Sequence, residues 1–153
     1  MDWFTLFILW ILLFCGLLLR LSYAWEWHKI RKAKDFTSIM KLSHRQFEYR
    51  TWERMKAKWR TKVKVWIGKA DGGIDVEGWK DGKYWYVQCK HYSPKSTIPV
   101  QTIRELYGTA MNKSKSAKTM FVATCGYTKP AQEEAAQMGM KLVGRRNIVD
   151  ELL

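Results

Sequence analysis

Cysteine is scarce in this chain of 153 residues, which contains only three. Cys15 lies in an apolar run, and neither Cys89 nor Cys125 shows a C-x-x-C or Cys/His spacing. An odd, scattered set of this kind argues against a disulfide scaffold and against a zinc site. We interpret the three residues as small buried thiols in a reducing compartment.

Internal repeats and low-complexity segments are absent, and acidic residues are few. The chain has 27 Lys and Arg against 14 Asp and Glu, which gives a formal net charge of +13. Such an excess is typical of proteins that bind a polyanion, either nucleic acid or an anionic lipid surface. The length suits one domain with an appendage.

Charge is also missing from Trp3 to Leu19. A helix of this length, continued past a snorkelling Arg20, nearly matches a hydrocarbon core of about 30 Å. Aromatic residues at both ends fit an interfacial belt. A signal peptide is the alternative, but the positively charged start of one is missing, and S-Y-A at 22–24 only faintly resembles a cleavage site. We predict one transmembrane helix within an anchor at residues 1–27.

The charges that flank the apolar run predict its orientation. Asp2 precedes the run, and five basic residues follow it: Arg20, Lys29, Arg31, Lys32 and Lys34. The positive-inside rule then predicts a single-pass protein of the inner (cytoplasmic) membrane, with its domain in the cytoplasm and membrane lipid as a partner of the helix. Residues 28–42 are predicted as a basic juxtamembrane linker and residues 43–153 as the domain.

Hydrophobic periodicity predicts a mixed α/β domain after the linker. Ser43 and Gln46 form a capping box at the start of an amphipathic helix. Glu48 lies inside the apolar stripe of this helix, where an unpaired carboxylate would be costly. The remaining elements are expected as strands at 62–67, 74–79 and 83–90, a helix from Pro99, a strand at 119–124, a helix from Thr128, a strand at 141–143 and a helix at 147–152.

The pair Asp81-Gly82 joins two of these strands and is a strong signal for a two-residue hairpin loop. Such a loop pairs Asp75 with Gln88 on one face of the hairpin, and Lys90 points to the same face. An aspartate and an amide oxygen suit a hard cation such as Mg²⁺, and a nearby lysine suits phosphodiester hydrolysis. The alternative is an ordinary polar face exposed to solvent.

Two motifs, D-G-G-I-D at 71–75 and Y-V-Q-C-K-H-Y at 86–92, closely resemble the Mrr-type branch of the restriction endonuclease-like, PD-(D/E)xK nucleases, which shows a Q-x-K variant. The resemblance covers about residues 42–153 and continues through R-Q-F-E at 45–48, V-Q-T-I-R-E-L-Y-G at 100–108 and F-V-A-T-C-G-Y-T-K-P-A at 121–131. It implies a restriction endonuclease-like core, with a mixed central sheet flanked by helices.

The resemblance also implies a role for each candidate catalytic residue. Asp75 is the main metal ligand, Gln88 takes the place of the usual acid, and Lys90 is the catalytic lysine. Glu48 matches the helix glutamate that completes or supports the site. The implied cofactor is Mg²⁺ or Mn²⁺, which a neutral glutamine should hold more weakly than a second acid would.

Ten basic residues lie between Lys41 and Lys69, against only Glu48 and Glu53. A surface of this kind favours phosphate contacts that bind DNA without reading its sequence, and attraction to anionic lipid is the alternative. No recognition-helix or zinc-finger signature is present. The candidate DNA contacts are Arg45, Lys56, Lys58, Arg60, Lys69 and Arg104.

Together these features predict a membrane-anchored, metal-dependent DNA endonuclease that acts on foreign or modified DNA. The alternative is a catalytically inactive nuclease-fold module that binds or tethers DNA at the membrane. A third hypothesis is a membrane scaffold whose charges serve lipid only. Cutting both strands would need a homodimer or two successive visits.

Overall fold

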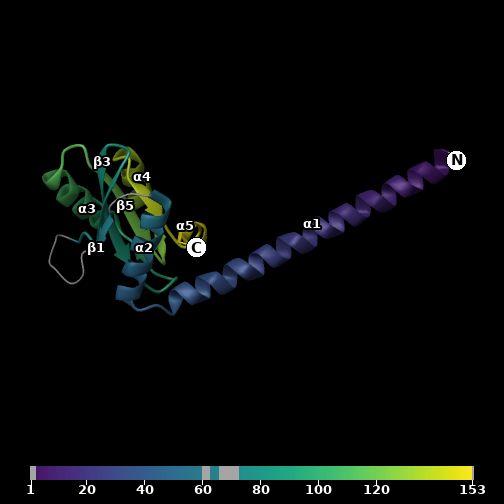
Figure 1. Ribbon diagram of the computed structural model, residues 1–153, viewed down its shortest axis with the longest axis horizontal. Coiled ribbons are helices and arrows are strands. Elements are labelled where there is room, and N and C mark those ends of the chain that lie inside the picture. Colours follow the sequence, from purple (N-terminus) through teal and green to yellow (C-terminus); the bar gives the residue numbers. More distant parts are fainter. Residues whose placement is uncertain (1–2, 60–62, 66–72, 153) are drawn as a thin grey trace. The chain divides into compact units, whose positions relative to one another are not determined.

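The computed structural model describes residues 3–59, 63–65 and 73–152. The chain divides into two compact units, Met1–Asp35 and Phe36–Leu153 (Figure 1). The first unit is helical and belongs to α1 (Trp3–Met40), and the second unit holds the sheet and all the other helices. We describe each unit by itself.

Helix α1 exposes large apolar side chains in the first unit, including Trp3 at 93% and Leu19 at 70% of their possible surface. Among the described residues, however, no helix is long and apolar enough to span a membrane. The predicted transmembrane anchor is therefore not supported. In the sequence, the charge-free part of this 38-residue helix ends at Leu19, before Arg20. The membrane location inferred from the anchor stays a prediction.

The stretch that we expected as a linker is helical up to Met40, and its end belongs to the second unit. Ile39 is 1% exposed and lies in a core cluster against which Phe36 packs. The domain therefore begins earlier than residue 43. The basic residues before Phe36 suggested a linker. The apolar side chains of Phe36 and Ile39 find their packing partners only in the folded domain.

Helix α2 (His44–Trp59) begins with the capping box that the sequence predicted. The backbone N–H of Ser43 donates to Gln46 Oε1 at 2.8 Å, and the N–H of Gln46 donates to Ser43 Oγ at 3.3 Å. Phe47, Thr51 and Met55, spaced by four residues, form its buried face. This face orients the helix against the sheet.

The five-stranded sheet has the order β1-β2-β3-β5-β7. Its first three strands are antiparallel, and β5 and β7 continue parallel to β3. The strands are β1 (Val63–Val65), β2 (Val76–Lys80), β3 (Lys83–Lys90), β5 (Lys118–Ala123) and β7 (Lys141–Val143). A separate parallel pair, β4 (Thr97–Ile98) with β6 (Gly126–Tyr127), was not predicted, because two residues are too few to show a period.

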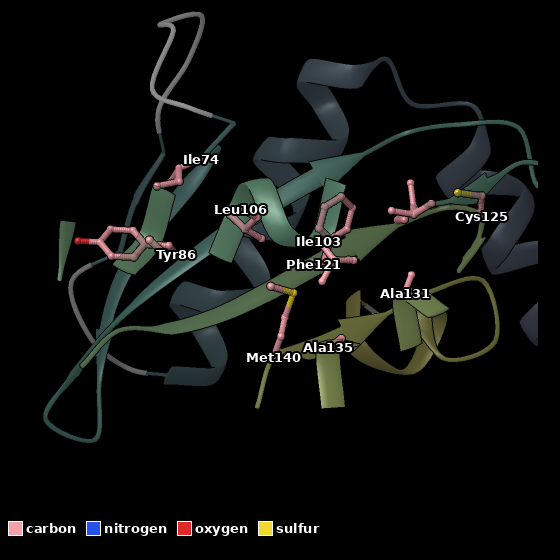
Figure 2. Packing of buried hydrophobic residues seen from close by; sticks show 12 residues of the cluster. Ile74, Tyr86, Ile103, Leu106, Phe121, Cys125, Ala131, Ala135 and Met140 are labelled. Atoms are coloured by element: carbon pink, nitrogen blue, oxygen red, sulfur yellow. The ribbon is translucent and has the colours of Figure 1, made fainter. Parts of the chain in front are cut away.

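Helices cover both faces of the sheet, so the predicted mixed α/β fold with a flanked central sheet is confirmed (Figure 1). On one face, α3 (Val100–Lys113) and α4 (Lys129–Gln137) pack in a cluster around Phe121 and Ile103 (Figure 2). On the other face, α2 and α5 (Ile148–Leu152) pack in a second cluster around Phe47 and Val87. Each face of the sheet thus has its own core.

Candidate active site

The hairpin between β2 and β3 has the register that the sequence predicted. Asp81 (φ 52°) and Gly82 (φ 74°) occupy the left-handed conformation that a tight two-residue turn requires. Glu77 pairs with Tyr86, and the ladder reaches Val76 opposite Val87. The pairing ends there, and the predicted placement of Asp75 opposite Gln88 stays a prediction.

Asp75 is held by the backbone of β3 on both sides of Gln88. Its own N–H donates to the carbonyl oxygen of Val87 at 2.9 Å. The N–H of Cys89 donates to Asp75 Oδ2 at 2.6 Å. One carboxylate oxygen is thus fixed by the sheet. Sequence reasoning missed this backbone donor, because every residue type except proline carries one.

Gln88 is the least satisfied member of the site. Its side chain is buried, with 7% of the residue exposed. Among the buried side-chain oxygens and nitrogens of the described residues, only Gln88 Oε1 has no hydrogen-bond partner. A buried polar atom without a partner costs about 1–3 kcal/mol, so this oxygen requires an explanation.

Gly73 makes room for the Gln88 side chain. It has a φ of 83°, and a Cβ built on it would overlap the Gln88 amide nitrogen. Gly73 belongs to the D-G-G-I-D motif, of which Asp71 and Gly72 lie outside the described residues. Gly73 is therefore a positioning residue for Gln88.

We expect Gly73→Ala to lower the free energy of unfolding by about 1–2 kcal/mol, because a Cβ is strained at this φ, and to displace Gln88. Thermal unfolding with EDTA and with Mn²⁺ would show a lower Tm and a smaller gain from the metal. Gly108→Ala is the matched control, because Gly108 lies in α3 with nothing near its Cβ position and should become slightly more stable. Equal behaviour of the two variants would contradict this role of Gly73.

Glu48 and Lys90 complete the electrostatic environment of Asp75. Lys90 ends β3, and Glu48 lies in the first half of α2. Lys90 lowers the pKa of both carboxyl groups, and Glu48 raises the pKa of Asp75, so the three charges interact directly. The structure therefore brings the charges of Asp75, Lys90 and Glu48 near one another. Gln88 lies two residues before Lys90 in β3.

Burial is the main influence on both carboxyl groups. It raises the pKa of Asp75 from 3.8 to about 6, although the bond from Cys89 opposes the shift. Burial also raises the pKa of Glu48, against the lowering effects of His44, Lys90 and Arg45. Ionising both carboxyl groups is costly because they are partly buried and repel each other. A cation bound between them would offset this cost, so the arrangement favours cation binding.

The position of Glu48 depends on how the start of α2 is packed. The imidazole of His91, directly after Lys90, lies 5.3 Å from the Phe47 ring, centre to centre. His91 Nε2 lies 3.1 Å from the carbonyl oxygen of Ile39, at the end of α1. His91 therefore joins the exit of β3 to the elements that carry Glu48, which fits a structural role for this histidine.

The donor set fits a hard cation. No group of three or more His, Cys, Asp or Glu side chains that could hold a metal ion occurs in the part of the chain that the structure describes. The available ligands are instead the carboxylate of Asp75, the unpartnered amide oxygen of Gln88 and the nearby carboxylate of Glu48. Oxygen donors of this mixed kind, completed by water, suit Mg²⁺ or Mn²⁺.

Comparison with known proteins identifies the family of the domain. Residues 39–152 match the family model of the Mrr catalytic domain, described as a restriction endonuclease. The chain belongs to this family. The comparison with curated proteins found no match.

Three solved structures share the fold of this Mrr domain. The DNA modification-dependent restriction endonuclease AspBHI (TM-score 0.54, 13% identity) is matched over 78% of this chain and 35% of that one. The MspJI restriction endonuclease in complex with a 27-mer oligonucleotide (0.55, 16%) is matched over 74% and 28%. Protein VC1899 from Vibrio cholerae (0.52, 15%) is matched over 68% and 30%. The chain thus spans about a third of the length of these proteins.

Two of the predicted DNA contacts of the Mrr domain are engaged in ion pairs within it. Lys58 Nζ lies 3.0 Å from a carboxylate oxygen of Glu151, which joins α2 to α5. Arg104 donates two hydrogen bonds, of 2.9 and 2.8 Å, to the carboxylate of Glu134, which joins α3 to α4. These ion pairs already offset part of the charge of Lys58 and Arg104. Their contact with DNA stays a prediction.

The other predicted contacts differ in what the structure says of them. Lys56 Nζ lies 5.0 Å from the centre of the Trp52 ring, on the exposed side of α2. Arg45 is exposed and close enough to Glu48 to lower its pKa. Arg60 and Lys69 lie outside the described residues.

Proposed function

We propose that this Mrr-family chain is a metal-dependent DNA endonuclease that hydrolyses phosphodiester bonds. The single observation that carries the proposal is the buried Gln88 Oε1, which has no hydrogen-bond partner among the described residues. It belongs to β3, whose Cys89 and Lys90 both interact with Asp75. A bound cation would give this oxygen a ligand contact in place of the missing hydrogen bond. A surface-exposed polar face of a hairpin would not leave it buried.

In this proposal, Asp75 and Gln88 hold Mg²⁺ or Mn²⁺, and Glu48 completes or supports the site. The cation would polarise the scissile phosphate and lower the pKa of a bound water. Lys90, at the end of β3, orients the attacking water or offsets the charge that develops on the phosphate. The bond from Cys89 keeps one oxygen of Asp75 fixed and leaves the other for the cation.

DNA is the substrate class that we infer. The net charge of +13 suits a phosphate backbone, and one structure with the same fold is a complex with an oligonucleotide. Another is a DNA modification-dependent enzyme, so modified DNA should be tested beside unmodified DNA. Action on foreign or modified DNA belongs to this proposal.

The test is a cleavage assay with the full chain on plasmid, linear and modified DNA, with Mg²⁺, with Mn²⁺ or with EDTA. We expect cleavage that needs the metal and falls by about a hundredfold or more in Lys90→Ala. Lys83→Ala, an exposed lysine at the other end of β3, is the matched control. Cleavage that persists in EDTA, or that is equal in Lys90→Ala, would refute the proposal. Salt-sensitive binding without cleavage would favour the non-catalytic DNA tether.

A further inference from the structure

A basic groove lies beyond the ends of the parallel strands, outside the four residues of the candidate active site. It has a volume of about 360 Å³ and lies between the segment that leads into β4 and the turn that follows β7. Its positive charges come from Lys95, Arg145 and Arg146. No acidic side chain is among its lining residues, all of which the structure describes.

The groove lies at the end of the sheet at which β3 ends with Lys90. Lys90 pairs with Ala123, and the N–H of Thr124 donates to the Lys90 carbonyl oxygen at 3.1 Å. Cys125 follows directly, at the end of the core cluster away from Tyr86 (Figure 2). The N–H of Arg145 donates to the Cys125 carbonyl oxygen at 3.1 Å. The groove therefore lies at the end of the parallel strands at which β3 ends with Lys90.

The turn that carries the two arginines is tightly packed. The N–H of Gly144 donates to Asn147 Oδ1 at 2.9 Å, which closes the turn. A Cβ on Gly144 would lie 2.8 Å from the Tyr127 ring and 3.2 Å from the Cys125 carbonyl oxygen. Such packing keeps the turn in place against β6. The positive charges are therefore presented on a fixed surface, which lowers the entropic cost of binding.

The three cations differ in how they are used within the fold. The Arg145 guanidinium lies 5.8 Å from the centre of the Phe36 ring, and its Nη1 donates a long bond of 3.5 Å to the Pro94 carbonyl oxygen. Lys95 and Arg146 are exposed. We base the test on Lys95 and Arg146, because replacing Arg145 would also disturb its packing against Phe36.

We propose that this groove holds the phosphodiester backbone of a DNA strand next to the point of cleavage, a role that rests on the proposed nuclease function. Lys95 and Arg146 contact the phosphates, and the backbone of the turn sets their positions. The proposal thus adds a DNA-binding surface at the ends of the parallel strands to the one that we predict on the basic face of α2.

The experiment measures binding of the full chain to a DNA duplex of about 30 base pairs in EDTA, over a series of salt concentrations. We expect Lys95→Gln with Arg146→Gln to raise the Kd about tenfold or more at 0.1 M salt and to lower the salt slope by about two. Lys83→Gln with Lys115→Gln is the matched control, because it removes two exposed charges near the opposite ends of β3 and β5. Lys95→Arg with Arg146→Lys keeps the charges and should bind as the wild type does.

Binding by the groove variant that equals the binding of the control would overturn the proposal. So would an effect of the groove variant on anionic phosphatidylglycerol vesicles with none on DNA. Because binding is measured without metal, the result does not depend on catalysis. A wild type that never cuts DNA, but binds it through Lys95 and Arg146, would refute the nuclease proposal and support the groove.

Discussion

Replacing Asp75 with asparagine is expected to stop cleavage and, in the same variant, to stabilise the metal-free protein above pH 6. Asparagine keeps an oxygen that can accept the bond from the Cys89 N–H. It lacks the charge that we propose to hold the cation, so the rate of cleavage should fall by about a thousandfold or more.

The gain in stability follows from the raised pKa. The pKa of Asp75 is raised from 3.8 to about 6, mainly by burial. A raised pKa means that the stability contributed by the protonated group is fully present below about pH 3.8 and is lost as the pH rises through about 6. Ionised Asp75 therefore costs the metal-free protein about 1–2 kcal/mol at pH 8, after allowance for its partial exposure, and asparagine removes this cost.

Thermal unfolding in EDTA at pH 4 and pH 8 measures this effect. We expect the Tm of Asp75→Asn to exceed that of the wild type by several degrees at pH 8 and to approach it at pH 4. Asp81→Asn, an exposed turn carboxylate replaced by a residue that tolerates a positive φ, should change neither cleavage nor the pH dependence. A lower Tm of Asp75→Asn at pH 8 would show that Asp75 acts mainly as a structural acceptor.

Replacing Gln88 with glutamate is expected to produce a site that binds metal more tightly and folds less stably without it. The orphaned Oε1 would become part of a third carboxylate in the site that we propose for Asp75 and Glu48. A third negative charge should raise the affinity for Mn²⁺ by about tenfold or more. At pH 8 in EDTA, the same charge should lower the free energy of unfolding by about 2 kcal/mol, because it is buried beside like charges.

The gain in Tm across a series of Mn²⁺ concentrations, compared with EDTA, reports both effects, since a ligand that binds only the folded state raises its stability. Gln88→Leu is the control, because it removes the oxygen and leaves a similar volume. Its metal-free stability should be kept or improved, and its gain from Mn²⁺ should be reduced. If glutamate and leucine at this position responded equally to Mn²⁺, residue 88 would not be a ligand.

Local rules predicted much of the fold of the second unit. The capping box at Ser43 and the turn at Asp81-Gly82 depend on bonds within a few residues, so their sequence signals are strong. The turn also set the register of the hairpin, in which Glu77 pairs with Tyr86. The misplaced carboxylate of Glu48 was visible because it interrupts an apolar stripe.

Other features depended on contacts between distant segments and were not predictable in this way. The pairing of β4 with β6 joins residues 97–98 to 126–127, and neither strand is long enough for a pattern. The ion pair of Arg104 with Glu134 spans 30 residues, so Arg104 looked like a free charge in the sequence. The apolar run of α1 suggested a membrane span, which the described residues do not support.

By itself, the sequence predicted the residues of the candidate site, because a two-residue turn fixes the register between the strand that follows an aspartate and the strand that carries a glutamine and a lysine. The tertiary structure decided how that chemistry is balanced. Packing buries the Gln88 oxygen without a partner and shifts the pKa of Asp75, because burial depends on helices and strands that the local sequence does not position. The same packing brings Lys95 and Arg146 to one groove, at the end of the sheet at which β3 ends with Lys90.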